Sequence, residues 1–234
     1  MTTTPARPRI LPTIDVLDRA QAVRNAEVAF ALGVDGIFFN NADDDDGLLY
    51  AVASQLRETW PDKLIGAGYA TLGPTAALER SLRCKLDATW TARRDITSQG
   101  SSADAVEAAG ILKAHGRHSF FASVTTLGRS DDPRAADAAA RAWELGMVPT
   151  ASGEQTGWGP AHTLKAIRGA IGDAPLALAG YSASTCLAAL PVVPSHFFVA
   201  TAAGHGFQYL DPDQLRACMS RVAAAEFVSH IGER

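Results

Sequence analysis

Short apolar, β-branched segments alternate along the chain with longer segments whose apolar residues recur at helical spacing. The first pair is RILPTIDV, residues 9–16, which predicts a strand, and residues 17–33, which predict an amphipathic helix ending at Gly33. The same alternation continues to the last helix. The further strands expected are 36–41, 64–70, 88–92, 119–126, 147–151, 175–180 and 196–202. The further helices expected are 46–60, 74–85, 103–115, 133–146, 160–172, 185–190 and 211–228.

Eight strand-helix units at short spacing predict a single-domain (β/α)8 barrel of the TIM type. We expect residues 9–234 to form the barrel and residues 1–8 to be a disordered lead-in, since no composition shift divides the rest. A doubly wound open sheet is the main alternative. It more often has fewer strands and a glycine-rich first turn, whereas the first turn here, TIDVLDRA, has no glycine.

Composition and charge exclude several classes of function. The 234 residues carry a formal net charge of -4 without a basic stripe, which argues against nucleic acid as the main partner. No apolar run approaches the roughly 20 residues of a membrane span, and the N-terminus lacks the pattern of a secretory signal. The three cysteines and six histidines are scattered, so neither a zinc site nor a disulfide framework is expected. We therefore expect a cytoplasmic protein with neither a metal nor a redox cofactor.

The ends of the predicted strands supply the candidate catalytic residues, because TIM barrels carry their active sites at the carboxyl ends of the strands. Asp15 is a candidate general base, or alternatively the cap of the helix that follows it. Asn40 or Asn41 would polarise a carbonyl. Arg93 would hold charge on the ligand, or alternatively form a surface ion pair. Glu154 would act as an acid or base, or alternatively cap the next helix.

Three loops rich in small residues follow the last three strands. They are ASGEQTGWGP, AGYSAS and ATAAGHG, and small residues let backbone N–H groups approach a ligand closely. TIM barrels often bind phosphate at this position, which favours a phosphate or similar anion cradle; tight strand-to-helix turns are the alternative. The candidate binding residues are Ser152, Gly153, Thr156, Gly157, Gly180, Ser182, Thr201 and Gly204.

The same segments carry a family resemblance. TASGEQTG, LAGYSAS and FFVATA, together with RNAEVAFALGVDGIFFNN, resemble the BtpA/SgcQ family of TIM barrels over most of the chain. The resemblance implies a barrel distantly related to phosphate-binding barrels, whose members are linked to photosystem I biogenesis or to biosynthetic clusters. The chain departs from related barrels at two strand ends, where Ala92 and Arg93 replace an Asp-Asn pair and Thr125 replaces a lysine. These departures leave a non-catalytic binding or assembly role open.

Aspartates outside the strand ends are expected to serve structure. Asp43 to Asp46 begin a predicted helix, where acids cap free N–H groups and complement the helix dipole. Adjacent carboxylates diverge and the spacing is not that of a calcium loop, so capping is favoured over a metal site, although a weak Mg²⁺ role beside a phosphate ligand stays open. Asp35 and Asp87 open their strands at the opposite end of the barrel, where we expect them to stabilise the fold.

The sequence thus predicts an enzyme that binds a phosphorylated or otherwise anionic small molecule and performs acid-base isomerase or lyase chemistry. A non-catalytic binding or assembly protein is the alternative. Assembly into a homo-oligomer is left open.

Overall fold

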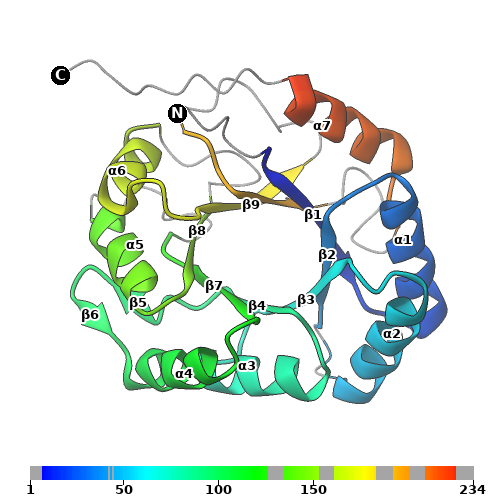
Figure 1. The fold of residues 1–234 in the computed structure, drawn as a ribbon, viewed down its shortest axis with the longest axis horizontal. Helices are drawn as coiled ribbons and strands as arrows, with labels where there is room; N and C mark the ends of the chain where they lie inside the picture. The colour runs from blue at the N-terminus through cyan, green and yellow to red at the C-terminus, as the bar shows by residue number, and fades with distance from the viewer. Residues whose placement is uncertain are drawn as a thin grey trace.

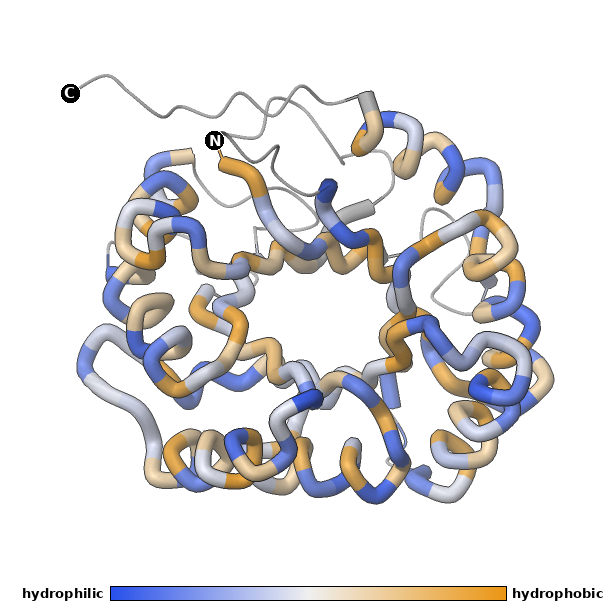
Figure 2. Tube along the Cα trace, in the orientation of Figure 1, coloured by the Kyte–Doolittle hydropathy of each residue, from blue (hydrophilic) through white to orange (hydrophobic). Residues whose placement is uncertain are grey.

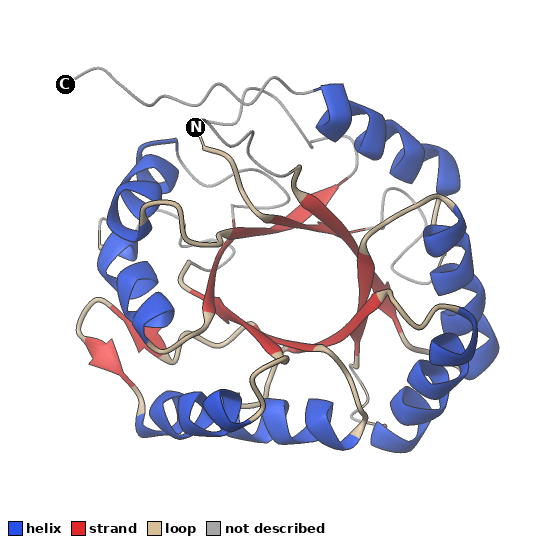
Figure 3. Cartoon of the chain, in the orientation of Figure 1, coloured by secondary structure: helices blue, strands red, loops and turns tan. Residues whose placement is uncertain are grey.

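The computed structural model describes residues 7–41, 43, 45–125, 134–152, 161–182, 192–200 and 209–224. In this part of the chain, eight parallel strands close into a barrel with the order β1-β10-β9-β8-β7-β4-β3-β2. The helices lie around the outside of the ring of strands (Figures 1 and 3). The predicted single-domain (β/α)8 barrel is confirmed.

The elements agree with the predicted alternation to within a few residues. The barrel strands are β1 (Arg9–Asp15), β2 (Gly36–Asn40), β3 (Leu64–Tyr69), β4 (Ala88–Thr91), β7 (Ser119–Ser123), β8 (Val148–Ser152), β9 (Ala177–Ser182) and β10 (His196–Ala200). The helices are α1 (Arg19–Ala31), α2 (Asp46–Thr59), α3 (Pro74–Arg83), α4 (Ala103–Ala114), α5 (Ala135–Glu144), α6 (Ala161–Ile171) and α7 (Pro212–Ala224). The helix expected over 185–190 lies outside the described residues.

One described feature was not predicted. A short antiparallel hairpin, β5 (Ile96–Thr97) and β6 (Gly100–Ser101), follows β4 and precedes α4. Each of its strands has two residues, which is too short for an alternating pattern to show in the sequence. The hairpin is anchored by Ile96, which is buried in the main core.

Two hydrophobic clusters hold the barrel together, and the strands that form its wall are mostly apolar (Figure 2). The larger cluster fills the space between strands and helices, and the smaller one fills the barrel interior. In most of the strands, alternate residues contribute to the two clusters, as the period of a strand requires. In the interior, the ring centroid of Phe198 lies 4.6 Å from that of Phe38 and 5.0 Å from that of Phe121. These three rings form an aromatic plug across the middle of the barrel.

The amino-terminal ends of the strands are joined by aspartates, in agreement with the structural role expected of Asp35 and Asp87. One Asp35 oxygen accepts a hydrogen bond from the backbone N–H of Ile10 at 3.0 Å. Asp87 accepts from the backbone N–H of Ile65 at 2.8 Å and from the Arg57 guanidinium. Each carboxylate therefore ties the start of one strand to a neighbouring segment.

Candidate functional site

The best-defined polar contact at the carboxyl-terminal mouth of the barrel joins the first two strands. Asp15 ends β1 and Asn40 ends β2, and the two are register partners in the parallel pair. The Nδ2 group of Asn40 donates a hydrogen bond to Oδ1 of Asp15 at 2.8 Å. Both residues are half-buried, so the pair borders the interior while remaining open to solvent. The structure thus brings together two of the predicted catalytic residues.

The turn after β1 keeps Asp15 in place. Gln21 of α1 donates from Nε2 to the backbone oxygen of Asp15 at 2.9 Å and accepts from the backbone N–H of Leu17 at 3.2 Å. The cap of α1 is Asp18, whose Oδ1 accepts from the backbone N–H of Gln21 at 2.8 Å. The alternative role of Asp15 as a helix cap is therefore wrong, since a different aspartate satisfies that helix terminus.

Asn41 is separated from this pair. It follows the last residue of β2, and alternation along a strand directs successive side chains to opposite faces. Its side chain is buried at 6% exposure, and its Nδ2 has no hydrogen-bond partner among the described residues. Of the two asparagines, only Asn40 is in contact with Asp15.

Hydroxyl groups connect the carboxyl ends of β4, β7 and β8. Ser123 donates to the backbone oxygen of Thr91 at 2.7 Å and accepts from Nε1 of Trp90 at 3.2 Å. The Thr125 hydroxyl donates to the backbone oxygen of Ser152 at 2.8 Å and accepts from the backbone N–H of that residue at 2.7 Å. Ser123 and Thr125 were not among the predicted site residues, although their position at a strand end was the available signal. Ser123 thus ties β7 to the end of β4, and Thr125 fixes the backbone from which the loop after β8 departs.

Arg93 lies in the loop after β4 and is paired locally. Its Nη2 lies 3.4 Å from Oδ1 of Asp95, and its side chain is 51% exposed. The same Asp95 oxygen accepts from the hydroxyl of Ser102, the cap of α4, at 3.2 Å. The geometry corresponds to the surface ion pair that was the alternative to ligand binding, an arrangement that contributes about 0–1 kcal/mol to stability.

Most of the predicted anion cradle falls outside the described residues. The cradle residues outside the described part of the chain are Gly153, Thr156, Gly157, Thr201 and Gly204, and the predicted catalytic residue Glu154 also lies outside it. Ser152 is the last residue of β8, and Gly180 and Ser182 lie within β9. Ser152 is the register partner of Ala179, and Ser182 that of Ala200, so the loops after β8, β9 and β10 leave from three adjacent strands.

The aspartate run after β2 caps a helix. Oδ1 of Asp45 accepts from the backbone N–H of Leu48 at 2.9 Å, which makes Asp45 the N-cap of α2 and confirms the predicted capping role for this residue. Oδ2 of Asp46 lies 3.3 Å from Nη2 of Arg83 on α3. Asp43 is exposed, and Asp44 lies outside the described residues. In the described ranges no three His, Cys, Asp or Glu side chains converge as metal ligands do.

Comparison with solved structures supports the fold and assigns no family. No family model and no curated protein matches the sequence. Phosphoribosylanthranilate isomerase from Thermotoga maritima is similar in structure, with a TM-score of 0.65 at 13% identity over 93% of this chain and 100% of that one. The native KDPGal structure has a TM-score of 0.66 at 15% identity over 95% and 96% of the two chains. A 3-hexulose-6-phosphate synthase has a TM-score of 0.62 at 16% identity over 90% and 99%. At these identities the likeness shows the TIM-barrel fold.

No helix in the described part of the chain has the length and apolar character needed to cross a membrane.

Proposed function

We propose that this protein is an enzyme that binds a phosphorylated or otherwise anionic metabolite at the carboxyl-terminal mouth of the barrel and carries out acid-base isomerase or lyase chemistry. The observation that carries the proposal is the hydrogen bond of 2.8 Å between Asn40 and Asp15. A carboxylate that is oriented by a neighbouring amide, at the end of the barrel where TIM barrels hold their active sites, is suited to move a proton.

The two side chains have separate roles in this chemistry. Asp15 takes a proton from a carbon next to a carbonyl and returns it at another position. An asparagine amide has two N–H donors, and one of the two on Asn40 is directed to Asp15. The second is available to a substrate carbonyl, where it stabilises the negative charge that develops on the oxygen. Glu154 and Arg93 are retained as further proposed site residues, acting as an acid or base and as a charge holder.

The phosphate group would bind in the loops after β8, β9 and β10. The adjacency of these three strands supports the proposal, because it allows Ser152, Gly180, Ser182 and Thr201 to contribute to one cradle. Similar structures support it as well. One phosphoribosylanthranilate isomerase structure holds reduced 1-(o-carboxyphenylamino)-1-deoxyribulose 5-phosphate, a ligand that carries a phosphate. Its TM-score to this chain is 0.66 at 13% identity.

A non-catalytic binding or assembly protein, as the BtpA/SgcQ resemblance suggests, is the second candidate. The observation that favours it is the engagement of strand-end groups in structural contacts. Arg93 is paired with Asp95, and Thr125 is bonded to the backbone of Ser152 through both its donor and its acceptor. Such a protein would bind the same class of ligand without converting it.

A thermal-shift titration with ribose 5-phosphate tests the binding step, because a ligand that binds only the folded state raises the melting temperature. Gly180→Val places a branched side chain in the proposed cradle and should weaken binding about tenfold or more, the effect of losing one or two charge-assisted hydrogen bonds. Gly169→Val is the matched control, since a Cβ there would meet no atom within 4 Å. Equal weakening by both variants would contradict the cradle.

Asp15→Asn separates the two candidate functions once a ligand is found. If the protein is an enzyme, this variant should retain affinity and lose turnover by roughly 10²–10⁴-fold, the range for a general base. If no bound ligand is converted by the unmodified protein, the binding role is favoured.

A crystal grown in sulfate with the anion at Arg93 or at Asp45, and none at Ser182, would place the anion site elsewhere.

A further inference from the structure

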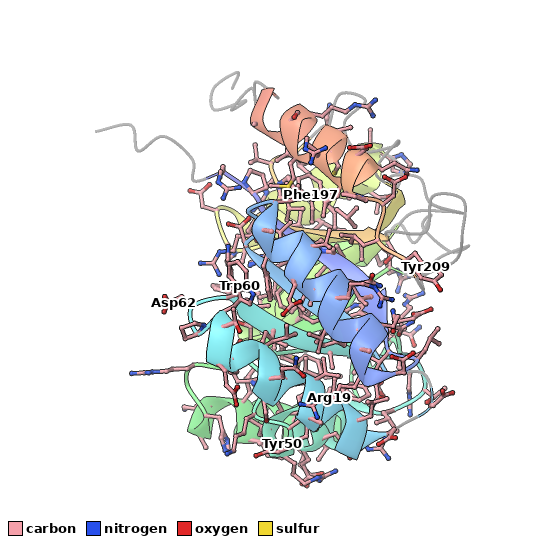
Figure 4. The ribbon with its side chains drawn as sticks, turned by 90° about the vertical axis from the view of Figure 1, so that its right-hand side faces the viewer. Arg19, Tyr50, Trp60, Asp62, Phe197 and Tyr209 are labelled. Carbon is pink, nitrogen blue, oxygen red and sulfur yellow. The ribbon has the colours of Figure 1, made fainter. Side chains whose placement is uncertain are left out.

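A cavity of about 240 Å³ lies at the amino-terminal end of the barrel, opposite the proposed catalytic mouth. Its walls come from the start of β1, the end of α2, the segment between α2 and β3, and the segments that precede β4 and β7. Figure 4 shows Asp62, one of its lining residues, at one end of the molecule and Tyr209 at the other. We propose that this cavity is a second anion-binding site, which takes a small polyanion such as inorganic pyrophosphate or a compact tricarboxylate.

The charge of the cavity is the first argument. Four of its lining residues are cationic, namely Arg9, Arg57, Lys63 and Arg117, and two are anionic, namely Asp62 and Asp87. The excess of positive charge is notable in a chain whose formal net charge is -4. A concave surface with an excess of one sign of charge concentrates ions of the opposite sign.

The hydrogen bonding of these side chains is the second argument. Asp87 is occupied by Arg57 and by the backbone N–H of Ile65, so it does not neutralise the other cations. Lys63 donates to the backbone oxygen of Val34 at 2.6 Å. The guanidinium groups of Arg9 and Arg117, in contrast, have no hydrogen-bond or ion-pair partner among the described residues. Two guanidinium groups without a partner in the described part of the chain, both lining one small cavity, are suited to bind an anion through paired N–H donors.

The backbone supports their convergence. Arg9 is the first residue of β1, two positions before Leu11, whose side chain belongs to the barrel interior. Alternation therefore directs Arg9 toward the barrel axis. Ser119, the first residue of β7, lines the same cavity, and its hydroxyl adds a neutral donor. Residues from β1 and β7 thus face one ligand from different sides of the barrel opening.

The site is separate from the proposed catalytic mouth. The plug of Phe38, Phe121 and Phe198 fills the barrel between the two ends, with ring centroids 4.6–5.5 Å apart. A ligand in the cavity cannot reach Asp15 through these rings. The cavity is also too small for a folded partner, which favours a compact polyanion over an acidic protein surface.

His196 provides a local reporter. It is the register partner of Arg9, and its ring centroid lies 5.1 Å from that of Phe121 in the barrel interior. Burial and then the positive charge of Arg9 lower the pKa of His196 to about 4. An anion bound beside Arg9 would oppose the effect of that charge, so binding should raise the pKa of His196 toward its ordinary value.

Isothermal titration with pyrophosphate, and separately with citrate, tests the proposal on the full chain at constant ionic strength. The Arg9→Gln/Arg117→Gln variant should bind about tenfold more weakly or worse, because two charge-assisted contacts are lost. The matched control is Arg24→Gln/Arg141→Gln, which removes the same charge from exposed positions on α1 and α5 and should bind like the unmodified protein. Binding of both probes would indicate a general polyanion site, and binding of pyrophosphate alone a phosphate-selective one.

Several results would overturn the proposal. These are the absence of saturable binding of either probe, equal weakening in the control pair, and an unchanged affinity in the Arg9→Gln/Arg117→Gln variant. The Gly180→Val variant separates this site from the mouth: if it abolishes pyrophosphate binding while the arginine variant does not, the anion binds at the mouth.

Should the double variant fail to fold, Arg117→Gln alone changes only an exposed side chain and should still weaken binding. An NMR titration of His196 with no change of its pKa at saturating pyrophosphate would likewise contradict binding beside Arg9.

Discussion

A Cβ atom added to Gly66 would lie 2.5 Å from Cζ of Phe38, its register partner on the neighbouring strand. The Phe38 ring therefore occupies the space that a side chain at Gly66 would need. Gly68 makes room for Trp90 in the same way, because a Cβ atom added to Gly68 would lie 2.8 Å from Cε3 of Trp90. The two glycines of β3 thus admit the large interior rings of β2 and β4.

Gly66→Ala should consequently destabilise the protein. The added methyl group forces the aromatic plug to shift, and overpacking of this kind costs about 1–3 kcal/mol. Gly110→Ala on α4 is the control, because a Cβ there meets no atom within 4 Å and alanine stabilises a helix by about 0.4–1 kcal/mol. Urea denaturation measures both free energies of unfolding. Equal stability of Gly66→Ala and the unmodified protein would show that Phe38 can move without cost.

Replacement of Asp35 should reveal the importance of its backbone contact. Asp35→Ala leaves the buried N–H of Ile10 without its acceptor, which costs about 1–3 kcal/mol, whereas Asp35→Asn keeps an oxygen acceptor and should cost less. Arg7→Ala should change stability by no more than about 1 kcal/mol, because its ion pair with Asp35 involves a side chain that is 60% exposed. Thermal and urea unfolding of the three variants test this order. A loss in Arg7→Ala as large as that in Asp35→Ala would assign the stability to the ion pair instead.

Asp45→Ala should destabilise α2 by about 1 kcal/mol, because the N-cap carboxylate is lost, while Asp45→Ser should retain most of the stability. The exposed Asp43 is the comparison, and Asp43→Ala should have little effect.

We also expect EDTA to leave the melting temperature unchanged. Tightly bound metal found by elemental analysis, and lost in Asp44→Ala, would show instead that the run holds an ion.

The pKa of His196 predicts loss of stability in acid. This pKa is lowered from 6.5 to about 4 in the folded protein, chiefly by burial and secondly by Arg9. Between these values the unfolded chain binds a proton that the folded protein does not. The destabilising effect of His196 is therefore absent above about pH 6.5. As the pH falls from 6.5 toward 4, this effect lowers the free energy of unfolding by at most about 3 kcal/mol.

The difference between His196→Gln and the unmodified protein isolates this effect, since the carboxylates titrate in both. Urea unfolding at pH values between about 6.5 and 4 should show a smaller loss of stability in His196→Gln than in the unmodified protein. His118→Gln is a second comparison, because burial also lowers the pKa of His118. Parallel stability curves for His196→Gln and the unmodified protein would contradict the prediction.

The sequence predicted the barrel because the periods that define its elements are local. Apolar spacing distinguishes strand from helix without knowledge of any distant residue, and eight such units in succession favour a closed barrel. The same local reasoning predicted a capping role for the run that includes Asp45 and the structural contacts of Asp35 and Asp87. It missed the hairpin of β5 and β6, whose strands have two residues each, and it gave Asp15 an alternative capping role that belongs to Asp18.

Tertiary structure decided which of the residues at the strand ends meet. Both Asn40 and Asn41 were candidates, and the register of β2 with β1 brings only Asn40 to Asp15. The cavity around Arg9 and Arg117 had no sequence signal, because its cations come from separate elements and follow no shared period. Local patterns depend on the geometry of the backbone within one element. Convergence of side chains from distant elements depends on how the strands pair when the barrel closes, which the sequence pattern alone does not specify.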